Sequence, residues 1–115
     1  MRLKGYVSVA IPVPVSVQNL VLRDYCSRHG HSLSLADVEF VMGSHHMLEG
    51  MDEYIDNFDG ILAYSMWIFP ESEERRDMVY TAYADKEIHF ALEGYVLPRD
   101  QTTVETLWKL RACGL

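Results

Sequence analysis

Residues 59–67, DGILAYSMW, decide the fold of this 115-residue chain. The turn-forming pair Asp59-Gly60 leads directly into an uninterrupted apolar run, and Pro70 follows shortly after it. A short apolar run between two turn signals is typical of a strand buried on both faces, as in a parallel sheet. We therefore expect a central parallel strand here, and parallel strands need long crossover connections that are usually helical.

Strand-like and helix-like segments alternate on both sides of this run. Three further strands are predicted from β-branched, aromatic or alternating apolar residues, at 3–11, 33–41 and 87–93. Four helices are predicted from apolar spacing and capping residues, at 16–29, 47–57, 72–86 and 102–113. This order predicts one α/β domain over residues 1–115, with three layers and a mostly parallel four-stranded sheet in the order 2-1-3-4 flanked by helices.

The first helix carries two local predictions. Ser16 is expected to cap its amino end through the side-chain oxygen, and Gly30 is expected to end it in a left-handed conformation. The apolar residues at helical spacing, which we expect to face the core, are Val17, Leu20, Val21 and Tyr25.

Capping residues and cysteines give further local predictions. Ser72 is expected to cap the third helix, and Thr102-x-x-Glu105 is expected to form a capping box at the start of the last one. Cys26 and Cys113 belong to no CxxC motif and are too few for a disulfide framework. Both are therefore predicted to be small buried apolar residues.

The charge balance weighs against nucleic acid as a partner. Ten Lys and Arg residues against 17 Asp and Glu residues give a net charge of −7, and residues 29–74 contain no Lys or Arg. Nucleic-acid affinity depends on cations that neutralise phosphates, so we expect no nucleic-acid partner. Pro12 and Pro14 interrupt the apolar residues near the amino terminus, so we expect no signal peptide, no membrane span and a cytoplasmic location.

The candidate site follows from the predicted sheet. Ligands of open α/β sheets bind beyond the carboxyl ends of the strands, where the strand order reverses. Two carboxylates at such ends, Glu39 and Glu93, are expected to act as acid and base. The other side chains expected to contact a ligand there are Gln18, Asn19, Arg23, Tyr64 and Ser65. A buried ion pair, with Arg23 as a partner for a carboxylate, is the alternative to catalysis.

The histidines give no metal-binding pattern. His45 and His46 are adjacent, so they cannot easily chelate one ion, and His29-x-His31 lies at a predicted helix end, where the helix dipole favours it. A zinc site would need a third ligand in suitable geometry. We therefore expect neither a metal nor a cofactor.

Several segments resemble the catalytic domain of serine recombinases over roughly residues 1–95. These are MRLKGYVSV, the glutamine at the start of the first helix, the glycine after it, and DGILAYS followed by an arginine-containing helix. The resemblance implies a resolvase-like, flavodoxin-like fold. That family carries Arg-x-Ser at the end of the first strand and a pair of arginines after the third. Here Ala10 stands at the position of the nucleophile and MWIFPES contains no cation, so we expect no recombinase activity.

The chain is also similar, over nearly its whole length, to sporadic carbohydrate cluster proteins. The similarity rests on PVPVSVQNLVLRDYC, DGILAYSMWIFPESEERRDMVY and IHFALE. It implies a role in sugar-precursor or surface-polysaccharide biosynthesis, with a sugar or nucleotide-sugar bound at the strand ends. It also adds Arg75 to the candidate ligand contacts, and Arg75 becomes a second possible partner for a buried carboxylate.

Two other functions stay open. One of them is not catalytic, so the sequence does not decide whether the protein is an enzyme. A non-catalytic module would assemble with itself or with a glycan enzyme through the apolar loop 67–69 and the last helix, so a homodimer or larger homo-oligomer is expected. A nucleoside deoxyribosyltransferase-like enzyme would use the first strand with its Tyr6-Val7-Ser8, and Asp59-Gly60 and Glu71 as its acidic elements.

Overall fold

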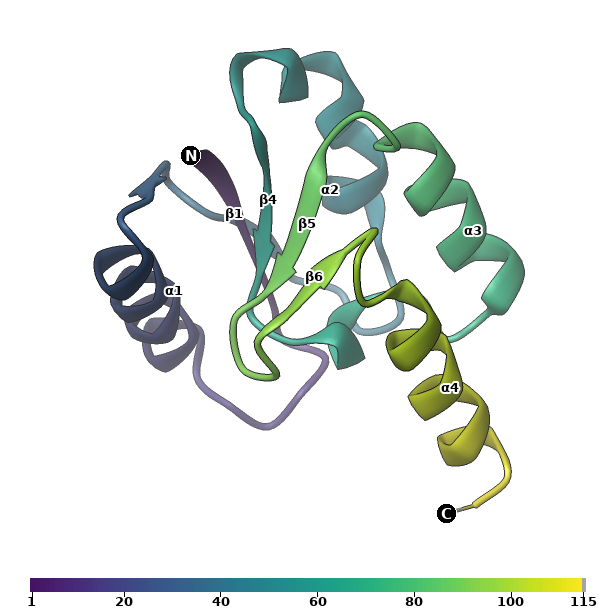
Figure 1. Ribbon diagram of the computed structural model, residues 1–115. Coiled ribbons are helices and arrows are strands. Elements are labelled where there is room, and N and C mark those ends of the chain that lie inside the picture. Colours follow the sequence, from purple (N-terminus) through teal and green to yellow (C-terminus); the bar gives the residue numbers. More distant parts are fainter. Residues whose placement is uncertain (115) are drawn as a thin grey trace.

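A six-stranded sheet forms the centre of residues 1–114, the part of the chain that the computed structural model describes. Its strands are β1 (Arg2–Ser8), β2 (Ser32–Leu33), β3 (Asp37–Glu39), β4 (Gly60–Ala63), β5 (Glu87–Phe90) and β6 (Tyr95–Leu97). The α-helices of these residues are α1 (Val15–His29), α2 (His46–Glu49), α3 (Glu73–Ala82) and α4 (Gln101–Ala112). Figure 1 shows α1 on one side of the sheet and the other three helices on the opposite side. The predicted α/β class is therefore confirmed.

The sheet is parallel except at one edge. Its order is β2-β1-β4-β5-β6, and β3 pairs with β1 on the same side as β2. The strands β1 to β5 pair in parallel, whereas β6 is antiparallel to β5. All four residues of β4 are buried, which explains why this segment is a continuous apolar run rather than an alternating one.

The prediction of four strands is wrong at two places. The segment predicted as one strand at 33–41 divides into β2 and β3, and between them the Ser34 N–H bonds to the Leu3 carbonyl (3.0 Å). At the other edge the chain turns back after β5 and adds β6. Gly94 allows this reversal with a φ of 77°, which glycine adopts readily, and its N–H bonds to the Phe90 carbonyl (2.8 Å).

Helix α1 presents a different face to the sheet from the predicted one. Val17 is 42% exposed and Leu20 is 58% exposed. The buried residues of the helix are Gln18, Leu22, Tyr25 and Cys26. Ser16 does not cap the helix, because Pro14 precedes it and the Pro14 carbonyl accepts from the N–H groups of Val17 and Gln18. A prediction from apolar spacing places glutamine on the solvent side of a helix. Because Gln18 is buried, the face of α1 that packs on the sheet differs from the predicted one.

Three other local predictions are confirmed and one is wrong. Gly30 ends α1 with a φ of 70°, and the Ser72 side chain caps α3 by accepting from the Arg75 N–H. Cys26 is buried as predicted. Cys113 is exposed, because it follows the last residue of α4 rather than facing the core.

Helices α2 and α3 are shorter than the predicted ones, whereas α1 and α4 agree with their predicted bounds to within one residue. The segment 47–57 contains α2 and then the 3-10 turns Gly50–Glu53 and Ile55–Asn57, since Gly50 disfavours continuation of the helix. Helix α3 ends at Ala82, four residues before the predicted end at Lys86. Among the helices of residues 1–114, none has both the length and the apolar character that crossing a bilayer requires.

Gly60 begins β4, and replacing it by alanine is expected to lower the free energy of unfolding by about 1–3 kcal/mol. A Cβ atom there would meet the main-chain carbonyl oxygen of Glu87 on β5, and a backbone atom cannot rotate away. Gly50 is the matched control, because its φ is −85° and nothing lies within 4 Å of an added Cβ atom. Gly50→Ala is expected to be neutral or to stabilise by up to about 1 kcal/mol. Urea unfolding compares the variants, and equal stabilities would contradict the tight β4–β5 contact.

Candidate functional site

The candidate residues lie mostly at the carboxyl edge of the parallel strands, but many of their polar groups are already bonded within the chain. Gln18 is the clearest example, since its side chain is fully buried. Its amide nitrogen donates to the carbonyls of Ser8 (2.7 Å) and Val13 (2.9 Å), and its oxygen accepts from the Ser8 N–H (3.1 Å). Gln18 therefore holds the loop between β1 and α1 in place.

Glu39, the last residue of β3, is buried and bonded to the backbone of α2. Its Oε1 accepts from the N–H groups of Met47 (2.6 Å) and Leu48 (3.1 Å) and from the Tyr6 hydroxyl (3.2 Å). Burial and the Glu39 carboxylate raise the pKa of Tyr6, so this phenol stays protonated. Among residues 1–114, Glu39 does not form the ion pair with Arg23 or Arg75 that was the alternative to catalysis. Backbone N–H groups supply the hydrogen bonds that its buried carboxylate needs.

Ser65 and Glu93 do come together, as their places at neighbouring strand ends predict. The Ser65 hydroxyl donates to Glu93 Oε2 (2.6 Å) and accepts from the Trp67 N–H (3.1 Å), while Glu93 Oε1 accepts from the Met66 N–H (2.8 Å). Together these bonds fix the 3-10 turn Met66–Ile68 that follows β4. The pair therefore ties the ends of β4 and β5 to one another.

The two candidate catalytic carboxylates are not brought together. Glu39 ends β3 and Glu93 follows β5, with β1 and β4 between them. Three strand spacings place them on the order of 14 Å apart. Paired carboxylates that cleave a glycosidic bond stand about 5–9.5 Å apart. The two residues therefore do not form such a pair in this structure.

The remaining candidates are dispersed. Arg23 is exposed on α1 and makes no polar contact with residues 1–114, and Asn19 is half-buried in the first turns of the same helix. Tyr64 is buried directly after β4. Arg75 lies on α3, and its guanidinium pairs with Glu49 of α2 (2.6 Å). Arg75 thus belongs to the junction between the two helices.

An aromatic and cationic wall lies at the carboxyl edge, next to Ser65 and Glu93. Trp67 follows Ser65 in the 3-10 turn and meets Trp108 of α4 edge to face, with ring centroids 4.7 Å apart. The Arg111 guanidinium carbon lies 4.9 Å from the Trp67 centroid and 5.3 Å from that of Trp108, within cation–π range. This wall borders an open cavity of about 550 Å³, lined by Ile11, Trp67, Leu107, Leu110 and Arg111.

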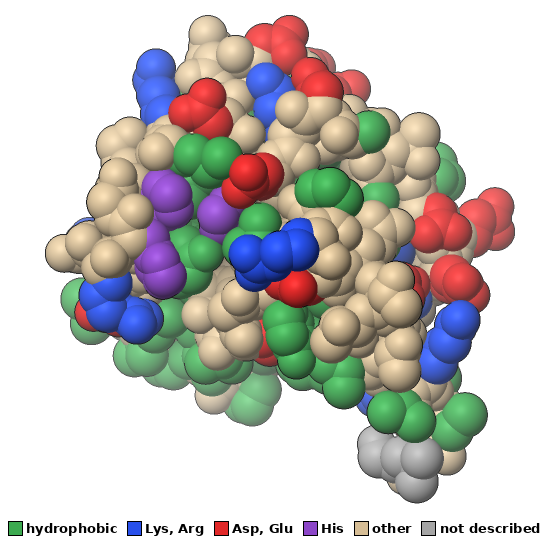
Figure 2. All heavy atoms as spheres, in the orientation of Figure 1, with side chains coloured by type: hydrophobic (Ala, Val, Ile, Leu, Met, Phe, Trp, Pro, Cys, Tyr) green, Lys and Arg blue, Asp and Glu red, His purple; other side chains and the backbone are tan. Residues whose placement is uncertain are grey.

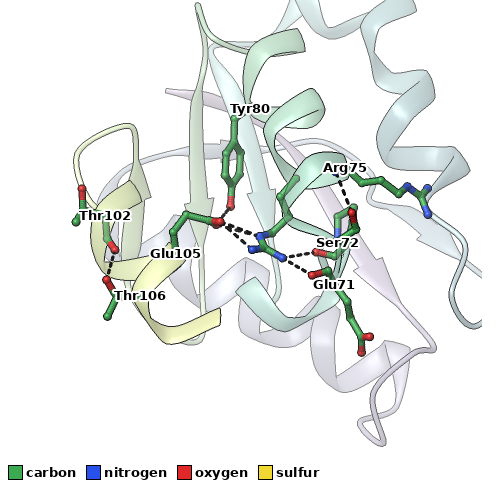
Figure 3. A network of polar contacts seen from close by, with 9 residues as sticks. Glu71, Ser72, Arg75, Tyr80, Thr102, Glu105 and Thr106 are labelled. Carbon is green, nitrogen blue, oxygen red and sulfur yellow. Dashed lines mark hydrogen bonds and ion pairs between the residues drawn. The ribbon is translucent and has the colours of Figure 1, made fainter. Parts of the chain in front are cut away.

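A buried ion pair holds this wall in place (Figure 3). Arg76 of α3 donates from Nε and Nη2 to the Glu105 carboxylate of α4, with Nη2–Oε1 at 2.8 Å. Its Nη1 donates to the carbonyls of Pro70 (3.1 Å) and Glu71 (2.6 Å), and the Tyr80 hydroxyl donates to Glu105 (2.9 Å). The Arg76 guanidinium also lies 4.4 Å from the Trp108 centroid. Helices α3 and α4 and the loop after β4 are therefore joined at one point.

This ion pair shows why the predicted capping box is wrong. Helix α4 begins at Gln101 after Asp100, and the Glu105 carboxylate bonds to Arg76 and Tyr80 rather than to the helix amino end. A buried guanidinium needs a carboxylate partner more than an exposed helix end needs a cap. Arg111 and Trp108 were missed as candidate residues, and their i, i+3 spacing on one helix is the only signal that points to them.

Taken with its helical layers, the sheet places the chain in the resolvase-like class of folds. The N-terminal catalytic domain of TP901-1 integrase is a similar solved structure, with a TM-score of 0.70 and 16% sequence identity over 99% of this chain and 96% of that chain. No protein-family model matches the sequence, and no curated protein matches it. At this identity the likeness shows the fold alone, so the resemblance to sporadic carbohydrate cluster proteins stays a prediction.

Proposed function

We propose that the protein binds a sugar phosphate or nucleotide-sugar at the carboxyl edge of its sheet, in sugar-precursor or surface-polysaccharide biosynthesis. The observation that carries the proposal is the wall formed by Trp67, Trp108 and Arg111 beside an open cavity. An indole ring offers an apolar face to a sugar or a nucleobase, and a guanidinium donates charge-assisted hydrogen bonds to a phosphate.

Arg111 has the exposure that a phosphate ligand would require. Its side chain is 50% exposed, and its nearest carboxylate, that of the largely exposed Glu71, stands 3.8 Å away. An exposed ion pair of this kind contributes little and is easily replaced by a more highly charged ligand. Arg76, by contrast, is buried and committed to Glu105, so Arg111 is the cation of this wall that a ligand would reach.

We propose that the protein is not a recombinase, because this edge of the sheet does not offer the groups that phosphoryl transfer requires. Ala10 follows β1 where the recombinase nucleophile is expected, and the nearby Ser8 hydroxyl accepts from the Ala10 N–H (3.0 Å) and bonds to no basic side chain of residues 1–114. The arginines that follow the β4 loop, Arg75 and Arg76, are each paired with a glutamate. A phosphodiester would meet neither an activated nucleophile nor unpaired cations there.

Ligand titration of an Arg111→Gln variant tests the proposal. UDP-glucose, GDP-mannose and glucose 1-phosphate are the probes, and at least one is expected to raise the melting temperature of the wild-type protein. Arg111→Gln is expected to weaken that ligand about tenfold by calorimetry, since it removes one charge-assisted contact. Lys109→Gln, on the same helix and making no polar side-chain contact with residues 1–114, is the control and should bind like the wild type. No thermal shift with any probe, or equal affinity for both variants, would refute the proposal.

A homodimer stays a prediction from the sequence. The cavity beside Trp67 is lined partly by Leu107 and Leu110, and Leu110 is exposed, so a second copy could cover the same wall. Sedimentation equilibrium with and without the bound nucleotide-sugar separates the two uses of this surface, because a dimer across the wall would dissociate when the ligand binds.

A further inference from the structure

A second pocket of about 510 Å³ lies away from this wall, between the carboxyl end of α1 and the strands β5 and β6. Its polar lining consists of Tyr25, His29, His31, Glu87, His89 and Arg99. Figure 2 shows histidine side chains gathered on this face of the molecule. The carboxyl-edge candidates contribute none of these residues, so the pocket is a separate feature of the fold.

A partly buried hydrogen-bonded chain forms the floor of the pocket. His89 of β5 lies between Glu87 on the same strand and Tyr25 of α1, with Nε2 2.9 Å from Glu87 Oε1 and Nδ1 2.6 Å from the Tyr25 hydroxyl. Because a carboxylate can only accept, Nε2 carries the proton, and burial lowers the pKa of His89 so that it stays neutral. Nδ1 then accepts from Tyr25, which leaves the phenol oxygen able to accept a hydrogen bond from a ligand.

Potential cations surround the mouth of the pocket from three segments. His29 ends α1, and its ring lies tilted at 37° against that of Tyr25 with centroids 4.3 Å apart. His31 lies in the next loop, and its ring stacks on that of His29 with centroids 6.1 Å apart. Arg99 follows β6, and its side chain is 69% exposed. The carboxylates nearby are already bonded, Glu87 to His89 and Asp100 to Arg99 and to the Val96 N–H.

We propose that this pocket binds a hydroxylated phosphate monoester. The tetrahedral phosphate meets donors from His29, His31 and Arg99, which come from different segments and suit an anion with three oxygens better than a planar carboxylate. A ligand hydroxyl donates to the Tyr25 oxygen, which His89 and Glu87 hold in place. The apolar residues Val96 and Leu97 cover the carbon skeleton.

Binding should strengthen as the pH falls, because the His31 imidazole must be protonated to attract an anion. Burial lowers the pKa of His31, the Met1 amino group and His29 lower it further, and Glu87 opposes them. The carboxyl end of α1 also disfavours an anion while the imidazoles are neutral. A phosphate bound beside His31 favours the protonated imidazole, so the affinity for the phosphate rises between pH 8.5 and pH 6.5. His89 faces Tyr25 and Glu87 and stays neutral in this range.

Calorimetry with glucose 6-phosphate and inorganic phosphate tests the proposal. Glucose 6-phosphate is expected to bind about fivefold or more tightly at pH 6.5 than at pH 8.5. Arg99→Gln should weaken both probes about tenfold, and the double variant His29→Gln/His31→Gln should abolish the pH dependence. Tyr25→Phe should weaken glucose 6-phosphate but leave inorganic phosphate unchanged, which a loss of folding would not do.

Controls separate this site from the carboxyl edge. Lys109→Gln, which lines neither cavity, should bind glucose 6-phosphate in the pH-dependent way of the wild-type protein, and circular dichroism checks that each variant is folded. Absence of binding at pH 6.5 would overturn the proposal, as would an affinity that is equal at both pH values or unchanged in Arg99→Gln. Because Arg99→Gln and Arg111→Gln remove a cation from different cavities, failure of one proposal is distinguishable from failure of the other.

Discussion

Replacing Glu105 by alanine is expected to lower the free energy of unfolding by about 3–5 kcal/mol. The Arg76 side chain is 3% exposed, and the substitution would leave its guanidinium with two backbone carbonyls and no counter-charge. The Tyr80 hydroxyl would lose its acceptor at the same time. A buried charge without a partner costs far more than a surface ion pair contributes, so the loss should be among the largest from one side chain outside the apolar core.

Urea unfolding of Glu105→Ala and Thr102→Ala distinguishes the ion pair from a capping box. If Thr102 and Glu105 capped α4, the two variants would each cost about 1 kcal/mol. In the structure the Thr102 side chain caps nothing, and its carbonyl merely accepts from the Thr106 hydroxyl. Thr102→Ala should therefore change stability by less than about 0.5 kcal/mol. A small effect of Glu105→Ala would show that α3 and α4 are not joined through this carboxylate.

Local signals predicted the fold, and long-range contacts account for what the sequence missed. The run 59–67 predicted a central parallel strand because burial on both faces removes alternation, and Gly30 and Ser72 were predicted because their roles depend on adjacent residues. Glu105 fits a local capping pattern as well as Gly30 and Ser72 do, but its predicted role is wrong. Its true partner lies 29 residues away on another helix, and spacing along the chain contains no information on that contact.

The contacts of the candidate site and of the second pocket also differ in how far the sequence predicts them. Ser65 and Glu93 were predicted together because the ends of parallel strands meet at one edge, and the structure joins them. The Tyr25–His89 bond spans 64 residues, and only the i, i+2 spacing of Glu87 and His89 on one strand could have indicated it.

Replacing Gln18 by leucine is expected to lower the free energy of unfolding by about 2–4 kcal/mol. Leucine has a similar volume but cannot form hydrogen bonds to the backbone. The Ser8 N–H and the Ser8 carbonyl would therefore lose the hydrogen bonds that they make with Gln18 while remaining buried. Each buried unsatisfied group costs about 1–3 kcal/mol, and the Val13 carbonyl would lose a bond as well. An amide that makes three internal bonds has little capacity left for a ligand, so stability rather than affinity should report its role.

The neighbouring Asn19 provides the matched control. It lies one residue further along α1, is half-buried, and makes no side-chain hydrogen bond with residues 1–114, so Asn19→Ala should change stability by less than about 0.5 kcal/mol. Thermal and urea unfolding of both variants measure the difference. If Gln18→Leu were as stable as the wild type while its binding of UDP-glucose fell, Gln18 would be a ligand contact and the loop between β1 and α1 would be held by other groups.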